Sequence, residues 1–95
     1  MSGGTRFTCP AELTISTADE VKEGLLACVS GPVVVDVSAV RAVDTAGLQV
    51  LVAATKTWER RRVGWGRQGS SRALEDAIQS SGLSEWWNRW SEAAQ

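Results

Sequence analysis

Four polar residues near the middle of the chain have the types and the spacing to do chemistry: Asp36, Ser38, Asp44 and Thr45. Asp36 and Ser38 follow a run of three valines, and Asp44 and Thr45 stand directly before a segment with helical apolar spacing. Side-chain oxygens at a helix start accept hydrogen bonds from amides that have no partner within the helix. We therefore take this loop-to-helix junction as the candidate functional surface. We expect Asp36 and Ser38 to organise the loop that leads to it.

The hydroxyl of Thr45 has three interpretations that the sequence leaves open. It can act only as a cap for the helix that follows. It can accept a phosphate, which would bring about −1.5 to −2 charges to the positive end of the helix dipole, beside the carboxylate of Asp44. It can also contact a partner protein without being modified. In all three cases Asp44 sets the charge around the hydroxyl.

The composition argues against an enzyme. The chain has no histidine, which removes Ser-His and Cys-His nucleophile pairs, histidine metal ligands and a histidine general base. Asp36 and Asp44 could form a general acid/base pair or a carboxylate-only metal site, but no third carboxylate clusters with them in the sequence. Residues 64–69 match GxGxxG, yet no second strand ending in an acidic residue follows, as a dinucleotide site requires. We expect no catalytic residue, no metal and no cofactor.

Charge and cysteine content narrow the class of protein further. Ten Lys and Arg residues against eleven Asp and Glu residues give a net charge of −1, which argues against nucleic-acid or membrane-surface binding. No apolar run approaches the roughly 20 residues of a membrane span, and the N-terminus has no signal-peptide core. Cys9 and Cys28 are too few for a disulfide scaffold. We expect a cytoplasmic protein with reduced thiols, without membrane insertion.

The other elements must build the domain that presents the junction. We expect one domain over residues 1–95, with residues 1–4 and 91–95 frayed. Two short strands should pair as a hairpin or as adjacent edge segments, and the first helix should start with a capping box. The expected strands are 6–9, 12–15, 33–35 and 62–66, and the expected helices start at 17–20, at Thr45 or Ala46 (ending near Arg61), at Ser70 or Ser71, and within 83–90.

The order of these elements predicts an α/β fold. Strands and helices alternate from residue 33 onward, which predicts parallel inner strands with right-handed crossovers. The unbroken valine run predicts a central strand covered on both faces. The result is a roughly four-stranded mixed sheet with three to four helices mainly on one face. The tryptophans at positions 86, 87 and 90 either staple the C-terminus onto the sheet or form an exposed aromatic contact patch.

Apolar spacing divides the long helix after Thr45 into two faces. Gln49 and Lys56 fall toward solvent. The residues expected to line the core are Leu48, Leu51, Val52, Thr55 and Trp58. In the first helix the expected apolar stripe is Val21, Leu25, Leu26, Cys28 and Val29.

Residues 33–51 resemble a STAS domain, a family whose name joins sulfate transporters and anti-sigma-factor antagonists. The resemblance rests on Asp36-Val37-Ser38 and on Val43-Asp44-Thr45-Ala46-Gly47-Leu48, and it extends from Cys9 to the Gly82-Leu83 turn. It implies a STAS-like fold, with a mixed sheet and helices on one side. It also implies a protein that is not an enzyme by itself.

The resemblance implies roles for Thr45. In anti-sigma-factor antagonists the matching position is usually a serine, which is phosphorylated by a partner kinase that is also the anti-sigma factor. Threonine is also similar to Mla-type STAS subunits, which bind the ATPase of a phospholipid transporter, and chemotaxis-linked STAS proteins are similar too. The implied function is a bacterial-type signalling module switched by phosphorylation of Thr45. The alternative is an ATPase subunit or a chemotaxis-linked protein in which Thr45 is an unmodified contact.

In all three groups the resemblance places the partner contact around Thr45 and the second helix. Gly47 is expected to let a partner approach the helix closely, and Gln49 and Lys56 to extend the contact along the exposed face. The expected partner-binding residues are Asp44, Thr45, Ala46, Gly47, Gln49 and Lys56. Any nucleotide would belong to the partner.

Overall fold

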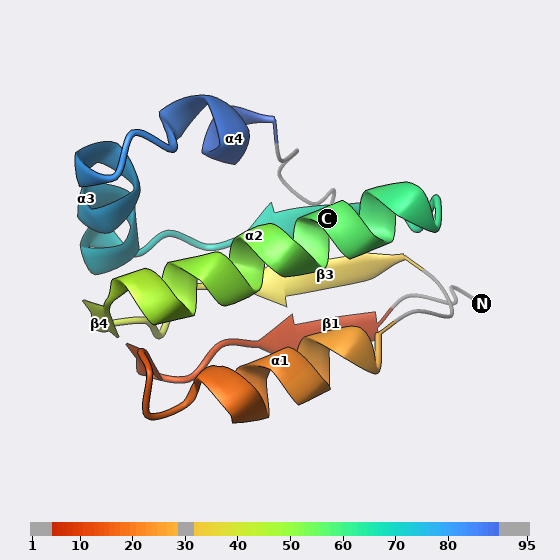
Figure 1. Cartoon of the computed structure of the whole chain (residues 1–95), viewed down its shortest axis with the longest axis horizontal. Helices are drawn as coiled ribbons and strands as arrows, with labels where there is room; N and C mark the ends of the chain where they lie inside the picture. The colour runs from red at the N-terminus through yellow and green to blue at the C-terminus, as the bar shows by residue number, and fades with distance from the viewer. Residues whose placement is uncertain (1–4, 29–31, 90–95) are drawn as a thin grey trace.

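The computed structural model describes residues 5–28 and 32–89 (Figure 1). The predicted α/β class is confirmed, with four helices in the described residues. The expected fraying of residues 1–4 and 91–95 lies outside these ranges. In chain order the elements are β1 (Thr5–Thr8), β2 (Glu12–Leu13), α1 (Ala18–Leu26), β3 (Val33–Asp36), β4 (Ala42–Val43), α2 (Thr45–Arg60), β5 (Trp65–Gln68), α3 (Arg72–Ser80) and α4 (Ser84–Asn88).

The strands form two small sheets in the described part of the chain. β3 lies between β1 and β5, and β2 pairs with β4. The expected pairing of the first two strands, as a hairpin or as adjacent edge segments, is wrong, because the chain leaves β1 at Cys9 and turns at Pro10 into the other sheet. Every described strand pair is parallel, where we expected a mixed sheet. Each connection between paired strands contains at least one helix. The connection is therefore long enough for the crossover that parallel strands require.

The helices α1 and α2 lie side by side across one face of the three-stranded sheet (Figure 1). Alternation along β3 turns Val33 and Val35 toward these helices, where both are buried, and leaves Val34 half-buried on the other face. The expectation that β3 is covered on both faces is therefore wrong. The other face is polar, and there Arg6 of β1 forms an ion pair with Asp36.

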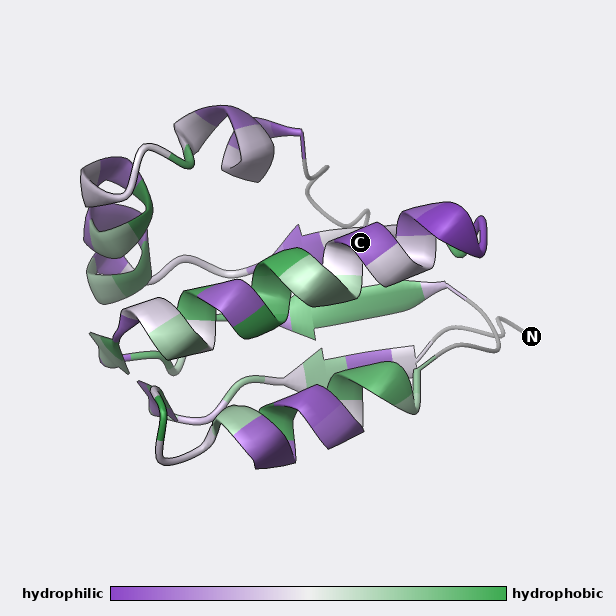
Figure 2. Cartoon of the chain, viewed as in Figure 1, coloured by the Kyte–Doolittle hydropathy of each residue, from purple (hydrophilic) through white to green (hydrophobic). Residues whose placement is uncertain are grey.

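The core lies between the sheet and helices α1 and α2, and α3 and α4 add Leu74, Ile78 and Trp87 to it. From α2 it receives Leu48, Leu51, Thr55 and Trp58 as expected, whereas Val52 is only half-buried. Figure 2 shows β3 as hydrophobic along most of its length and the last turn of α2 as hydrophilic. The largest fully buried side chains include Trp58, Leu13, Leu25, Leu51, Leu74, Val21, Val33 and Val35. No helix in the described residues combines the length and the apolar composition needed to cross a membrane.

The start of α1 differs from the expected capping box. Thr17 occupies the N-cap position, but its side chain makes no capping hydrogen bond. Its hydroxyl donates instead to the carbonyl of Glu12 at 2.7 Å and accepts from the amide of Thr14 at 3.2 Å. The hydroxyl thus ties the turn to β2. In the expected stripe, Val29 lies outside the described residues and Leu26 is 40% exposed.

β5 starts three residues later than the strand we expected over residues 62–66. The chain first has to reverse after α2, and Arg62 does this in a left-handed conformation with φ 57°. The amide of Val63 then bonds the carbonyl of Trp58 at 2.9 Å, which closes the helix end. This turn uses the residues that would have started the strand.

The C-terminal helices are attached by two kinds of contact. The hydroxyl of Ser71 caps α3 through the amide of Leu74 at 3.1 Å and donates to the carbonyl of Val40 at 2.7 Å. On α4, the indole of Trp86 donates to the hydroxyl of Thr55 at 3.1 Å, and Trp87 is buried. These two tryptophans attach α4 as a staple would, and the tryptophan at position 90 lies outside the described residues.

Candidate functional site

Asp44 organises the start of α2. It is the N-cap residue, in extended conformation, and its Oδ1 accepts a hydrogen bond from the amide of Gly47 at 2.9 Å. Its other oxygen, Oδ2, accepts from the amide of Ile15 at 2.9 Å. One carboxylate thereby connects α2 to the turn between β2 and α1, although residues 15 and 44 are far apart in the sequence.

The same bonds determine the charge of Asp44. The amide of Gly47, and after it the amide of Ile15, stabilise the carboxylate and hold the pKa of Asp44 below its ordinary value. The positive end of the helix dipole acts in the same direction. Asp44 is therefore a fixed negative charge at neutral pH.

Thr45 is the first residue of α2, and its side chain is exposed. The interpretation of Thr45 as the cap is wrong, because Asp44 occupies the N-cap position and bonds the amide of Gly47. Within the described residues the Thr45 hydroxyl forms no hydrogen bond. The hydroxyl is thus both accessible and uncommitted.

The exposed side of α2 continues from Thr45. Gln49 and Lys56 are exposed, and Ala46 is half-buried. Spacings of four and seven residues place Thr45, Gln49 and Lys56 on one face of the helix. At 1.5 Å per residue, this face extends roughly 16 Å from Thr45 to Lys56.

Gly47 does not belong to that face. It is buried, and a Cβ atom at this position would lie 1.9 Å from the carbonyl oxygen of Leu13 and 2.4 Å from its carbonyl carbon. The expectation that Gly47 lets a partner approach is therefore corrected: the glycine lets β2 approach α2. Because Gly47 has no side chain, α2 can lie close to β2. This close approach also brings Asp44 within reach of the turn at Ile15.

Asp36 and Ser38 form a separate cluster at the end of β3. Asp36 Oδ1 accepts from the amide of Ser38 at 2.9 Å and from its hydroxyl at 2.7 Å, and Oδ2 accepts from Arg6 at 2.7 Å. The Ser38 bonds first, and then Arg6, lower the pKa of Asp36. Gly69, with φ +82°, passes close to Ser38. These bonds hold the chain as it leaves the strand.

The structure does not bring Asp36 and Asp44 together as a catalytic or metal-binding pair. Each carboxylate is occupied by its own partners, Ser38 and Arg6 in one case and Gly47 and Ile15 in the other. No group of three or more Cys, Asp or Glu side chains in the described residues is arranged to hold a metal ion. Cys9 and Cys28 are both buried, and burial raises the pKa of Cys9 to about 12.

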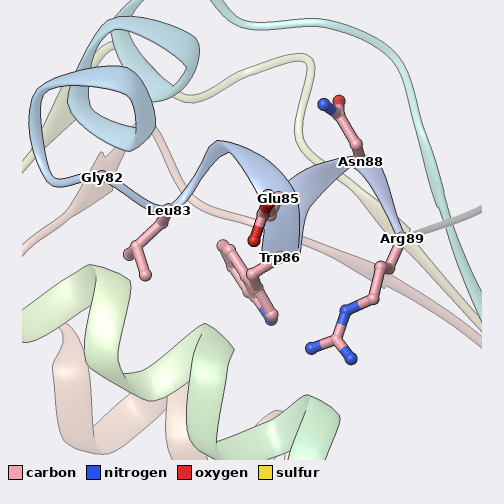
Figure 3. A pocket seen from close by; sticks show the side chains of 6 residues that line it. All are labelled: Gly82, Leu83, Glu85, Trp86, Asn88 and Arg89. Atoms are coloured by element: carbon pink, nitrogen blue, oxygen red, sulfur yellow. The ribbon is translucent and has the colours of Figure 1, made fainter.

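A pocket elsewhere on the molecule lies against α4 (Figure 3). Leu83 and Trp86 point from it toward α2, and Glu85 and Arg89 supply opposite charges. Its lining residues are Gly82, Leu83, Glu85, Trp86, Asn88 and Arg89. None of the junction residues lines this pocket.

Ile15 is a neighbour of the site that the sequence reasoning missed. The polar–apolar alternation of residues 12–15 predicted a half-buried strand, but β2 ends at Leu13 and Ile15 lies in a turn with 72% of its surface exposed. The available signal was the Thr14-Ile15-Ser16-Thr17 sequence, whose hydroxyl residues favour turns.

Comparison with known proteins identifies the family. The family model described as "Mlab, STAS domain" matches residues 10–87, which is most of the chain. The chain belongs to the STAS domain family. The family model confirms the expected family, and the solved structures confirm the STAS-like fold. STAS domains are protein-interaction modules. No curated protein matches the chain.

Solved structures show the same fold at low sequence identity. A sulfate transporter family protein from Wolinella succinogenes matches with a TM-score of 0.74 and 19% identity, over 90% of this chain and 71% of that protein. The murine Solute Carrier 26 family member A9 anion transporter, in its inward-facing state, matches with a TM-score of 0.75 and 19% identity, over 90% of this chain. This STAS domain spans only 15% of that transporter chain.

Proposed function

We propose that this STAS domain is a non-enzymatic regulatory module that binds a protein partner through the exposed start of α2, with the Thr45 hydroxyl as the point of control. The observation that supports this proposal is that the adjacent residues Asp44 and Thr45 have different roles. Asp44 caps α2, so the hydroxyl of the exposed Thr45 is not needed to hold the helix together. A hydroxyl that forms no hydrogen bond at the N-terminus of α2 can be modified without unfolding the helix.

Phosphorylation of Thr45 is the form of control that we propose. A phosphate brings about −1.5 to −2 charges and three strong acceptor oxygens. The helix dipole favours a negative charge there, while the ionised Asp44 next to it opposes one. The helix therefore stays formed, and the charge of the docking surface changes sharply. A partner that docks against the unmodified hydroxyl would be released, as in an anti-sigma-factor antagonist controlled by a kinase that is itself the partner.

The proposed contact continues along α2. Thr45, Gln49 and Lys56 supply exposed side chains on one face, and Ala46 flanks the first of them. Asp44 contributes its charge and not a free oxygen pair, because both oxygens accept bonds from the domain itself. Any nucleotide in the reaction is bound by the partner, and the protein acts in the cytoplasm.

A second function is favoured by the family model, whose description names an Mlab-type STAS domain. In this alternative the protein is a permanent subunit that binds the ATPase of a phospholipid transporter. Thr45 is then a contact residue that is never phosphorylated. The same surface of α2 is used in both proposals, and they differ in whether the hydroxyl changes.

Intact-mass measurement separates the two. The protein is incubated with ATP and each candidate serine/threonine kinase, and Thr45→Ala is compared with Ser16→Ala, which removes another exposed hydroxyl close by in the fold. The switch predicts one phosphate on the wild type and on Ser16→Ala and none on Thr45→Ala. A phosphate that persists on Thr45→Ala contradicts the assignment of the site. Stable co-purification with a transporter ATPase, without any phosphate, supports the subunit alternative.

Affinity measurement tests the surface itself. Thr45→Asp adds a charge at the docking point, and we expect it to weaken binding of the kinase or ATPase in titration calorimetry. The exposed Glu59 at the far end of α2 provides a control, Glu59→Gln. Equal affinity of wild type and Thr45→Asp, with both folded by circular dichroism, would rule out docking at this position.

A further inference from the structure

Ile15 presents an aliphatic side chain to solvent beside the junction. It is 72% exposed, and the other large exposed hydrophobic residue in the described part of the chain, Leu26, is 40% exposed. Single exposed apolar residues are common on protein surfaces. Ile15 differs because it lies beside the start of α2 and because hydrogen bonds fix the turn that carries it.

The turn that carries Ile15 is held by hydrogen bonds at each of its residues. The amide of Ile15 donates to Asp44 Oδ2 at 2.9 Å, and the amide of Thr17 donates to the carbonyl of Thr14 at 3.0 Å. The amide of Ser16 donates to the hydroxyl of Thr14 at 3.3 Å, and the Thr17 hydroxyl bonds back to β2. A preorganised turn loses little conformational entropy on binding, so burial of its apolar side chain contributes more fully to affinity.

Asp44 makes this turn part of the α2 surface. One of its oxygens caps the helix that begins with Thr45, and the other holds the amide of Ile15. Ile15 and Thr45 therefore flank a single carboxylate. A partner that covers Thr45 therefore lies next to the turn that carries Ile15.

Charge around this surface indicates what the partner carries. Glu12, Asp19 and Glu20 are exposed, and Asp19 and Glu20 lie in the first turn of α1, which begins at the same end of the molecule as α2 (Figure 1). Arg41 and Lys22, also exposed, offset part of this charge, to which the ionised Asp44 adds. Three consecutive arginines, Arg60-Arg61-Arg62, lie at the opposite end of α2. The Ile15 end is therefore apolar at its tip and predominantly acidic around it.

We propose that Ile15 is the apolar anchor of the docking surface, and that it enters an apolar socket on a protein partner whose rim carries Lys and Arg side chains opposite Glu12, Asp19 and Glu20 and not opposite Thr45. This inference rests on the proposed function, since it places the anchor on the surface that contains Thr45. A second copy of this chain does not fit, because two such ends would bring like charges together. A complementary basic rim would steer association and make it sensitive to salt.

Site-specific photocrosslinking in the native host identifies the partner without assuming it. The crosslinking residue p-benzoylphenylalanine is placed at position 15, at position 45, and at position 59 as a control on the last turn of α2. We expect the same protein to be captured from positions 15 and 45 and not from position 59. The crosslinked peptide of the partner should contain Lys or Arg beside apolar residues.

The captured protein is then purified and titrated with unmodified variants. Ile15→Ser should weaken the Kd about tenfold to a hundredfold, as expected for loss of one buried aliphatic anchor. Ile15→Leu should restore most of the affinity, and Leu26→Ser, which removes the other exposed hydrophobic residue, should leave the Kd within about threefold of wild type. Raising the salt concentration should slow association of the wild type. Thermal melts establish that each variant is folded.

The outcomes separate this inference from the proposed function. Two outcomes would overturn the role of Ile15 as the anchor but still support the docking surface. One is capture from position 45 but not from position 15. The other is an unchanged Kd for Ile15→Ser while Thr45→Asp weakens binding. Capture from neither position overturns both. Capture of a second copy of this chain from position 15, or a captured partner with an acidic contact peptide, overturns the stated chemistry of the partner.

Discussion

Gly47→Ala is expected to destabilise the protein although alanine is the better helix former. A Cβ atom at position 47 would lie 1.9 Å from the carbonyl oxygen of Leu13, and ordinary contact begins at 3.4 Å. α2 and β2 would have to separate by about 1.5 Å. The obstacle is backbone, so no side-chain rotation relieves it. The carbonyl of Leu13 also accepts from the amide of Asp44 at 3.2 Å, and that bond would be strained as well.

The size of the effect follows from two opposing terms. Overpacking costs typically 1–3 kcal/mol, and a backbone clash this short belongs at about 3 kcal/mol. Replacing glycine by alanine within a helix returns at most about 1 kcal/mol. We expect a net loss of about 2 kcal/mol in the free energy of unfolding. For a domain of this size that lowers the Tm by roughly 8–16 °C.

Urea unfolding followed by tryptophan fluorescence measures this loss, because Trp58 is fully buried. Gly64→Ala is the matched control, since a Cβ atom there meets nothing within 4 Å. That variant should be neutral or slightly more stable, because alanine restricts the unfolded chain. If Gly47→Ala is as stable as Gly64→Ala, the packing of α2 against β2 described above is wrong.

Three further predictions follow from the junction and the core. Thr45→Ala should change the free energy of unfolding by less than about 0.5 kcal/mol, whereas Asp44→Ala should lower the Tm clearly; the reverse order in calorimetric scans would return the capping role to Thr45. The pKa values of Asp36 and Asp44 are lowered in the folded state, so their stabilisation is present above the unfolded value of about 3.9 and is lost as the pH falls through the folded values. Urea midpoints should therefore fall below about pH 4, and less so in the Asp36→Asn, Asp44→Asn double variant; an equal fall in both proteins would refute this. The pKa of Cys9 is raised from 9.0 to about 12, so its contribution is complete below pH 9 and is lost above it, and iodoacetamide should label Cys9 far more slowly in the native protein than in urea. Equal labelling rates would show that the thiol is accessible.

Local patterns in the sequence were sufficient to predict α2 and the importance of its first turn. Apolar spacing located the helix to within one residue at its end, and the core positions Leu48, Leu51 and Trp58 are buried as expected. The choice of cap was not predictable, because Asp44 and Thr45 are both good N-cap residues. Which of them caps depends on where the chain turns into the helix, and the bond from the turn at Ile15 helps to hold Asp44 in that position.

Features that depend on contacts distant in sequence could not be predicted. The role of Gly47 arises from the carbonyl of Leu13 on a different element. Ile15 alternates correctly for a strand, yet β2 ends at Leu13, whose partner Val43 is followed directly by Asp44, the N-cap residue of α2. The pairing of β1 with β3 also depends on tertiary arrangement, since neighbouring short strands suit a hairpin equally well by pattern alone.

Amide chemical-shift mapping of the isotope-labelled protein, titrated with the purified kinase or ATPase partner, tests the docking surface most directly. The largest shifts should fall on Thr45 and Gln49, and the anchor predicts a further large shift on Ile15. The amides of Arg6 and Val34, on the polar face of the sheet, should be unaffected. Large shifts on that face, with Thr45 and Gln49 unmoved, would contradict the claim that this STAS domain binds through the start of α2.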